Sequence, residues 1–251
     1  MRAVLVVLYG IAAYLLFLAA FLYAVGFVGN FGVPKAIDSG AAAPIGETFV
    51  IDLLLLGLFA VQHSVMARPA FKRWWTRFVP KAVERSTYVL LASSVLLLLF
   101  WQWRPLADVV WVTGGAAAAV LTALFWCGWA LVVASTFLIS HFELFGLSQV
   151  FARSANCALP EPTFRTPWFY RSVRHPLYLG FLIAFWSAPS MSAGHLLFSI
   201  MTTGYVLVAI GFEERDLIDL FGDQYRQYRN RVGMLLPRWR TRKAHAPVVP
   251  R

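Results

Sequence analysis

Residues 176–212 read PLYLGFLIAFWSAPSMSAGHLLFSIMTTGYVLVAIGF and contain no Asp, Glu, Lys or Arg. As one helix this run would be about 55 Å long, whereas the hydrocarbon core of a bilayer is only about 30 Å thick. The segment APSMSAG at 188–194 supplies Pro, Ser and Gly, which interrupt helices. The run therefore predicts a tight helical hairpin that crosses the membrane twice, with spans at 176–190 and 193–212.

Four further apolar runs precede this hairpin and place the whole chain in the membrane. Hydrophobic residues make up 59% of the 251 residues and charged residues 14%, compared with about 45–50% and about 25% in soluble domains. A helix that spans a bilayer needs about 20 mainly apolar residues. The predicted fold is an all-α, polytopic transmembrane helical bundle of about six spans, of which the first four are 4–27, 48–66, 86–103 and 113–140.

The distribution of Lys and Arg predicts the orientation of this bundle. Basic residues gather in the loops 67–85 and 141–175 and in the C-terminal tail, whereas the loops 28–47, 104–112 and 190–192 carry few charges. Because Lys and Arg favour the cytoplasmic side, six spans with both termini in the cytoplasm satisfy every loop, and five spans would place the Arg-rich tail outside. The net charge of +10 is attributed to this orientation. Nucleic-acid binding, which needs a soluble basic face, is not expected.

A polar cluster opens the hairpin. Arg174, His175 and Pro176 lead into the apolar run, and Tyr178 and Gly180 follow within about one turn. Pro176 suits the first position of a helix, and a helix N-terminus attracts anions. Gly180 lets a ligand or another helix approach closely. In the alternative interpretation, Arg174 and His175 only anchor the helix at the membrane interface.

A second polar cluster follows the hairpin. Glu213 and Glu214 come directly after the last apolar run, and ionisable groups at a membrane edge are candidates for function. Paired carboxylates suit a ribose diol or a cationic sulfonium. Beyond them, FGDQYRQYRNRV at 221–232 predicts a cytoplasmic amphipathic helix with two tyrosines on one face. The alternatives are a surface helix that begins at Glu213 and a basic helix that lies on anionic lipid.

Histidines mark two further candidate positions. His141 and Glu143 lie in SHFELFGLSQ at 140–149, at the cytoplasmic end of the fourth span, and His63 lies within the second span. A histidine can act as a base near neutral pH, but each could equally be a polar residue of a membrane edge or of a bundle interior. Cys127 and Cys157 form no cluster with zinc spacing, so no metal site is expected.

The motif Arg-His-Pro-x-Tyr-x-Gly, followed beyond the hairpin by Glu-Glu and then Phe-Gly-x-x-Tyr-x-x-Tyr, resembles the membrane methyltransferases of the isoprenylcysteine carboxyl methyltransferase and phospholipid methyltransferase type. The resemblance extends from about Phe169 to Pro237. It implies binding of S-adenosyl-L-methionine. The implied cofactor contacts are Tyr170, His175, Pro176, Tyr178, Leu179, Gly180, Glu214 and, more weakly, Glu213. The family often has Gly-x-Tyr before Arg-His-Pro, and here RTPWFY at 165–170 takes that place, so the cofactor loop is expected to differ.

A shorter segment, HFELFGLSQ at 141–149, is similar to the bacterial methanethiol S-methyltransferases, which make dimethyl sulfide. This similarity implies a small thiol as methyl acceptor, Gln149 as a further cofactor contact, and the bacterial inner membrane as location. The thiolate would be the nucleophile. The expected roles are base for His141, stabilisation of the anion for Arg174 and Arg171, and substrate contact for Glu143 and His63.

Two other functions are compatible with the same pattern. The acceptor could be a prenylcysteine carboxylate or a lipid amine, or the protein could be a membrane transport or assembly protein that keeps only the hairpin scaffold. The expected division of the chain is N-terminal transmembrane helices at 1–140, a methyltransferase core at 141–240 and a disordered tail at 241–251.

Overall fold

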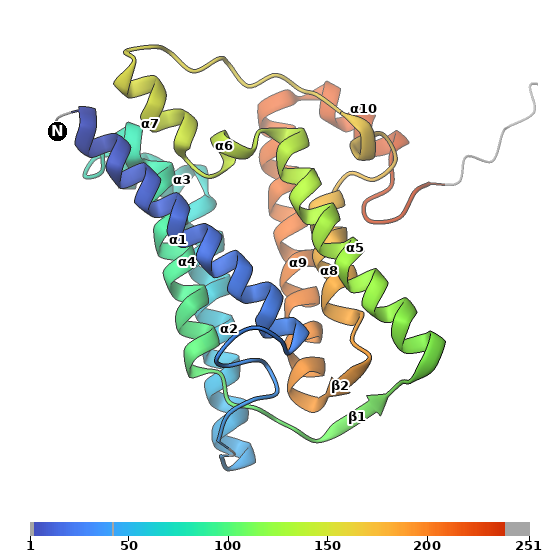
Figure 1. Cartoon of the computed structure of the whole chain (residues 1–251). Coiled ribbons are helices and arrows are strands. Elements are labelled where there is room, and N and C mark those ends of the chain that lie inside the picture. Colours follow the sequence, from blue (N-terminus) through green and yellow to red (C-terminus); the bar gives the residue numbers. More distant parts are fainter. Residues whose placement is uncertain (1–2, 42, 239–251) are drawn as a thin grey trace, which may run out of the picture.

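The computed structural model describes residues 3–41 and 43–238 (Figure 1). The expected disordered tail at 241–251 lies outside the described residues. The elements in chain order are α1 (Ala3–Gly29), α2 (Ile45–Ala67), α3 (Pro69–Trp75), α4 (Lys81–Gln102), β1 (Val109–Val112), α5 (Gly115–Ile139), α6 (His141–Leu144), α7 (Leu147–Ser154), the 3-10 helix η1 (Trp168–Arg171), α8 (Pro176–Trp186), β2 (Ser190–Ser192), α9 (Ala193–Phe221) and α10 (Asp223–Arg231).

Five helices are long and apolar enough to cross a membrane, and they confirm the predicted helical membrane bundle. These helices, α1, α2, α4, α5 and α9, have 22 to 29 residues. At about 1.5 Å per residue, each is longer than the roughly 30 Å hydrocarbon core. Their apolar side chains are largely exposed on the outside of the bundle, where lipid rather than water is the matching solvent. The protein is therefore an integral membrane protein.

The predicted hairpin is present, but its first arm is shorter than the sequence suggests. α8 ends at Trp186 after 11 residues, about 17 Å, so the expected span over 176–190 is wrong in length. The helix ends three residues before Pro189, and a proline cannot continue a helix because its nitrogen carries no hydrogen to donate. The second arm, α9, then begins at Ala193, where the Ser192 hydroxyl accepts a hydrogen bond of 3.0 Å from the His195 amide, a common way to start a helix.

A two-stranded antiparallel ribbon closes the turn of the hairpin and was not predicted. β1 pairs with β2, so that Val109 lies opposite Ser192 and Val112 opposite Ser190. The sequence VVWV favours a strand through its β-branched and aromatic residues. It falls within the segment 104–112, which is expected to be a loop because it precedes the span at 113–140.

α9 continues through Glu213 and Glu214, beyond the expected end of the last span at residue 212, so the alternative of a separate surface helix that begins at Glu213 is wrong. The helix runs unbroken to Phe221 and ends at Gly222, whose φ is 57°, a conformation that favours glycine. The helix continues because the residues between Phe212 and Phe221 include no Gly or Pro. From Ala193 to Glu214 the helix rises about 32 Å, so the carboxylates stand about one bilayer thickness from the ribbon.

The short helices α3, α6, α7 and α10 gather at one end of the bundle, and the ribbon lies at the other (Figure 1). The start of α1 lies at the same end as α10 (Figure 1). This arrangement places the ends of α5 and α9 and the segment before α8 together, so the candidate polar residues of all three lie at one end of the molecule.

Candidate active site

The start of α8 is fixed by the chain that follows α10. Val173 forms a parallel bridge with Gly233, and the Arg174 amide donates to the Gly233 carbonyl at 2.8 Å. The His175 amide donates to the Met234 carbonyl at 3.1 Å. Pro176 occupies the first helical position, as predicted. The two ends of the methyltransferase-like region, far apart in sequence, therefore meet at one point.

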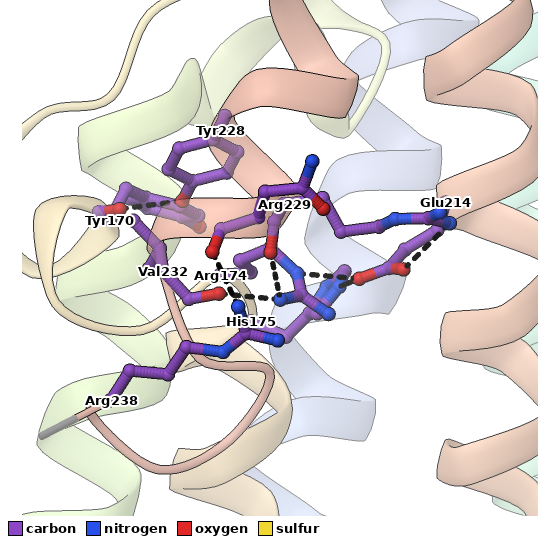
Figure 2. A network of polar contacts seen from close by, with 9 residues as sticks. Tyr170, Arg174, His175, Glu214, Tyr228, Arg229, Val232 and Arg238 are labelled. Carbon is purple, nitrogen blue, oxygen red and sulfur yellow. Dashed lines mark hydrogen bonds and ion pairs between the residues drawn. The ribbon is translucent and has the colours of Figure 1, made fainter. Parts of the chain in front are cut away.

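Glu214 is the centre of a buried ion-pair network that joins α8, α9 and α10 (Figure 2). Its Oε1 accepts from Arg174 Nε at 2.7 Å and lies 3.1 Å from His175 Nε2. Arg229 Nη1 lies 3.9 Å from Oε2. Arg174, His175 and Glu214 are each at most 9% exposed, so the Arg-His-Pro start and the Glu-Glu pair are in contact through buried side chains.

Arg174 also closes the end of α10. Its Nη1 donates to the carbonyl of Arg229 at 3.1 Å and to that of Val232 at 2.5 Å, both visible in Figure 2. The last carbonyls of a helix lack partners within the helix, and a guanidinium supplies donors in a rigid fork. These contacts direct Arg174 toward Glu214 and α10. Arg171, in contrast, is exposed in η1.

Tyr178 and Glu213 form a second, less buried pair beside this network. The Tyr178 hydroxyl lies next to the Glu213 carboxylate, and both side chains are partly exposed. Among the described residues Glu213 makes no salt bridge, whereas Glu214 contacts Arg174, His175 and Arg229. Of the two carboxylates, Glu213 is thus the one with capacity to bind a ligand.

Tyrosines of α10 line the same region. The Tyr228 hydroxyl donates to the Tyr170 carbonyl at 2.5 Å, which ties η1 to α10 (Figure 2). Tyr225 is 2% exposed, and its hydroxyl has no hydrogen-bond partner within 3–41 and 43–238. Burial and the charge of Glu214 raise the pKa of Tyr225. A buried hydroxyl without a partner is costly, so this group can donate to a ligand near the carboxylates.

Gly180 lies against another helix. A Cβ on Gly180 would stand 2.7 Å from the Gly128 carbonyl oxygen of α5, and a Cβ on Gly128 would stand 2.7 Å from the Gly180 carbonyl oxygen and from the Ala184 nitrogen. Only residues without a Cβ permit this backbone contact. Pro176 is buried, whereas Leu179 is partly exposed. The glycine of the motif thus fixes the position of α8, and with it the position of His175.

His141 is held by α1 and α5 and not by Glu143. The Thr136 hydroxyl donates to the Val133 carbonyl at 2.7 Å, so it accepts from Nδ1–H of His141 at 2.8 Å. Nε2 then accepts from the Tyr14 hydroxyl at 2.8 Å. The ring stacks on Phe137 with centroids 4.2 Å apart. Burial lowers the pKa of His141, so the imidazole is neutral at pH 7.

The other residues of the SHFELFGLSQ segment are placed by backbone contacts. The Glu143 side chain is exposed, and its carbonyl accepts from Gln149 Nε2 at 3.1 Å. Gln149 Oε1 is buried and has no hydrogen-bond partner in the described parts of the chain. Within the described residues, no hydrogen bond or ion pair joins His141 to the Arg174–His175–Glu214 network. The predicted residues therefore form two groups at the same end of the bundle.

Three residues that contribute to these groups were missed as candidates from the sequence. Tyr14 stands 127 residues before His141, and no local pattern links the two. Thr136 lies within an apolar run, where a hydroxyl commonly bonds to its own helix. Tyr225 belongs to the predicted pair of tyrosines, but only the fold shows that its hydroxyl is buried beside Glu214.

Comparison with known proteins gives the relatives of this chain. A methanethiol S-methyltransferase of Mycobacterium tuberculosis is 59% identical over 94% of this chain and 98% of its own length. Methanethiol S-methyltransferase 2 of Bradyrhizobium diazoefficiens is 57% identical over 93% and 90%. Nurim of Mus musculus is 32% identical over 66% of each chain. No protein-family model and no solved structure match the chain. With identity this high over nearly the whole of both chains, the protein belongs to the family of methanethiol S-methyltransferases.

Proposed function

We propose that the protein transfers the methyl group of S-adenosyl-L-methionine to the sulfur of methanethiol and so forms dimethyl sulfide. The observation that carries this proposal is the identity of 48–59% over most of the chain to proteins named for this reaction. The buried network of Arg174, His175 and Glu214 supports it, because it brings together the motifs that resemble those of membrane methyltransferases.

The residues around Glu213 fit the cofactor. The Tyr225 hydroxyl is buried and has no hydrogen-bond partner in the described residues, as expected of a group that binds a polar ligand. In the second group, Gln149 Oε1 is likewise buried without a partner in that part of the chain. When bound, the cofactor supplies an activated methyl group on a sulfonium. The Glu213 carboxylate suits a ribose diol or the cationic sulfonium, and the face of Tyr178 adds a cation–π contact. His175, Tyr170 and Leu179 complete the proposed contacts, while Glu214 fixes His175.

Methyl transfer from a sulfonium is an in-line displacement, and the protein's tasks are alignment and exclusion of water. The acceptor must lose its proton, because the thiolate is the nucleophile. His141 is neutral, but its Nε2 lone pair is occupied by the Tyr14 hydroxyl. As a base it would therefore act through Tyr14, which would take the thiol proton while passing its own to Nε2.

We propose that the protein lies in a bacterial inner membrane and that the polar end of the bundle faces the cytoplasm. The Arg-rich loops and α10 lie at that end (Figure 1), and Lys and Arg favour the cytoplasmic side. In this orientation the soluble cofactor enters from the cytoplasm, and the small apolar thiol can enter from either the water or the lipid.

Two assays test the proposal on the purified, detergent-solubilised protein. Headspace gas analysis should detect dimethyl sulfide when methanethiol and S-adenosyl-L-methionine are supplied together, and calorimetry should detect binding of S-adenosylhomocysteine. If S-adenosylhomocysteine binds but no dimethyl sulfide forms, the methyl acceptor is instead a prenylcysteine carboxylate or a lipid amine. Either acceptor can be assayed with a radiolabelled methyl donor. Absence of binding would favour a transport or assembly protein.

A further inference from the structure

His63 on α2 lies inside a cluster of aromatic rings contributed by three helices. Its Nε2 is hydrogen-bonded to the Tyr88 hydroxyl of α4 at 2.8 Å. The imidazole stacks on Phe59 with centroids 5.1 Å apart and meets the edge of Tyr205 of α9 at 6.5 Å. We call Phe59, His63, Tyr88 and Tyr205 the His63 cluster.

The second nitrogen of this imidazole has no partner. His63 Nδ1 is buried and makes no hydrogen bond within the described residues. Leaving a buried polar atom unsatisfied costs about 1–3 kcal/mol. Such an atom is suited to a ligand that brings one polar hydrogen into an otherwise apolar site. A small thiol is such a ligand, because its S–H group is its one polar hydrogen. Its sulfur also packs favourably against aromatic rings.

The His63 cluster adjoins the proposed cofactor site. Tyr178 lies within electrostatic range of both Tyr88 and Tyr205, and it is beside Glu213. An ion pair of 2.9 Å between Arg68 and Asp216 fixes the end of α2 against α9 near Glu213. His63 precedes Arg68 by five residues and therefore lies about 8 Å deeper along α2. Tyr178 is thus near both Glu213 and the His63 cluster.

On the basis of the methyl transfer proposed above, we propose that the His63 cluster binds the acceptor thiol and that Nδ1 of His63 takes its proton. When Nε2–H donates to the Tyr88 oxygen, Nδ1 carries the lone pair. The S–H bond breaks and the proton moves to Nδ1. The electron pair left on the thiol sulfur forms the new C–S bond with the methyl group, and the methyl–sulfonium bond breaks with its pair on the departing sulfur. His63 then releases the proton.

Two other histidines show why His63 is favoured. Both ring nitrogens of His141 are hydrogen-bonded, to Tyr14 and Thr136, whereas Nδ1 of His63 has no partner in the described residues. His195 also has a buried Nδ1 without a partner in the described residues, and its Nε2 donates to the Phe185 carbonyl at 2.9 Å. It lies at the ribbon end of α9, away from Tyr178 and the carboxylates. His195 is therefore a matched control for the loss of a buried imidazole.

The test compares His63→Ala and His63→Gln with His195→Gln in the full-length protein. Dimethyl sulfide formation from methanethiol is measured from pH 6 to pH 10, together with S-adenosylhomocysteine binding and thermal unfolding. Loss of a general base lowers the rate by about 10²–10⁴-fold, so we expect a decrease of this size at pH 7 in both His63 variants. We also expect all three variants to bind S-adenosylhomocysteine with an affinity within about threefold of wild type. The rate of His195→Gln should likewise stay within about threefold of the wild-type rate.

The pH profile distinguishes a base from a packing residue. Without the base, the rate should rise about tenfold per pH unit toward the pKa of the thiol, because free thiolate then becomes the nucleophile. The titratable and charged groups near His63 are Tyr88 and Arg85 of α4, Tyr205 of α9, Tyr178 of α8 and Arg68 after α2. These groups remain in both His63 variants.

Three results would overturn the assignment of His63: wild-type rates in both variants, an equal loss at every pH, or a loss of S-adenosylhomocysteine binding as large as the loss of rate. If both His63 variants unfold, Tyr88→Phe provides the test. It keeps the ring and removes the hydrogen bond to Nε2, and an unchanged pH profile would then count against the proposal. Failure of the methyl transfer itself would appear differently, as wild-type protein that forms no dimethyl sulfide.

Discussion

Glu213 and Glu214 are adjacent in sequence, yet their different surroundings indicate different roles, ligand binding for Glu213 and stabilisation of the site for Glu214. Glu214 is buried between Arg174 and His175, and removing one partner of a buried ion pair costs about 3–5 kcal/mol. Glu214→Gln should therefore lower both the thermal unfolding temperature and S-adenosylhomocysteine affinity. Glu213→Gln should weaken binding and leave the unfolding temperature nearly unchanged. Calorimetry and thermal unfolding of the two variants side by side measure this difference, and equal destabilisation would contradict it.

His141 gives the protein a pH-dependent contribution to stability. Burial lowers its pKa in the folded protein below the unfolded value of about 6.5. As the pH falls below about 6.5, the unfolded chain takes up the proton first, so stability decreases until the folded pKa is also passed. His141→Gln removes this titration. Between pH 7 and pH 5, the unfolding temperature of the variant should fall less than that of wild type, and a parallel decline would refute the prediction.

For single residues, the sequence predicts which side chains are candidates for the site better than it predicts which residues they bond to. Arg174, His175 and Glu214 are all candidates from the sequence, and they are in contact in the structure. Tyr14 and Thr136 could not be predicted as the partners of His141. Each hydroxyl lies in an apolar run, where it reads as an ordinary residue of a membrane span, and the sequence does not show how α1 packs against α6. Hydrogen bonds between distant helices depend on how the helices pack, and periodicity within one helix does not fix that.

Contact between helices α5 and α8 depends on two glycines. A methyl group at Gly180 or Gly128 would meet backbone atoms at 2.7 Å, and overpacking costs about 1–3 kcal/mol. Gly180→Ala should lower the unfolding temperature and displace His175. Gly204→Ala is the matched control, because a Cβ there meets nothing within 4 Å, and alanine is the better helix former by up to about 1 kcal/mol. Equal effects of the two substitutions on thermal unfolding would exclude backbone packing as the reason for Gly180.

Element boundaries follow local chemistry that hydropathy does not register. The hairpin was predicted from length alone, and it is present. The early end of α8 depends on Pro189, and the continuation of α9 through Glu213 depends on the absence of a helix breaker before Gly222. The ribbon could not be predicted, because VVWV and SMS form a stable pair only once the hairpin brings them together, and short strands need a partner.

Across the whole molecule, the polar residues lie at one end and the ribbon at the other (Figure 1), and the proposed orientation makes the polar end cytoplasmic. Cys157 is exposed in the loop before η1, and Cys127 is exposed on α5. In a Cys127→Ser background, an impermeant maleimide should label Cys157 in inverted membrane vesicles and not in intact spheroplasts. A second variant carries Cys127→Ser, Cys157→Ser and Ala107→Cys, which places the single cysteine in the loop before β1. This cysteine should be labelled in intact spheroplasts and not in inverted membrane vesicles. The two sites lie at opposite ends of a helix longer than the bilayer core, α5. Labelling of Cys157 from outside would separate the proposed active site from its cytoplasmic cofactor and so contradict the proposed orientation.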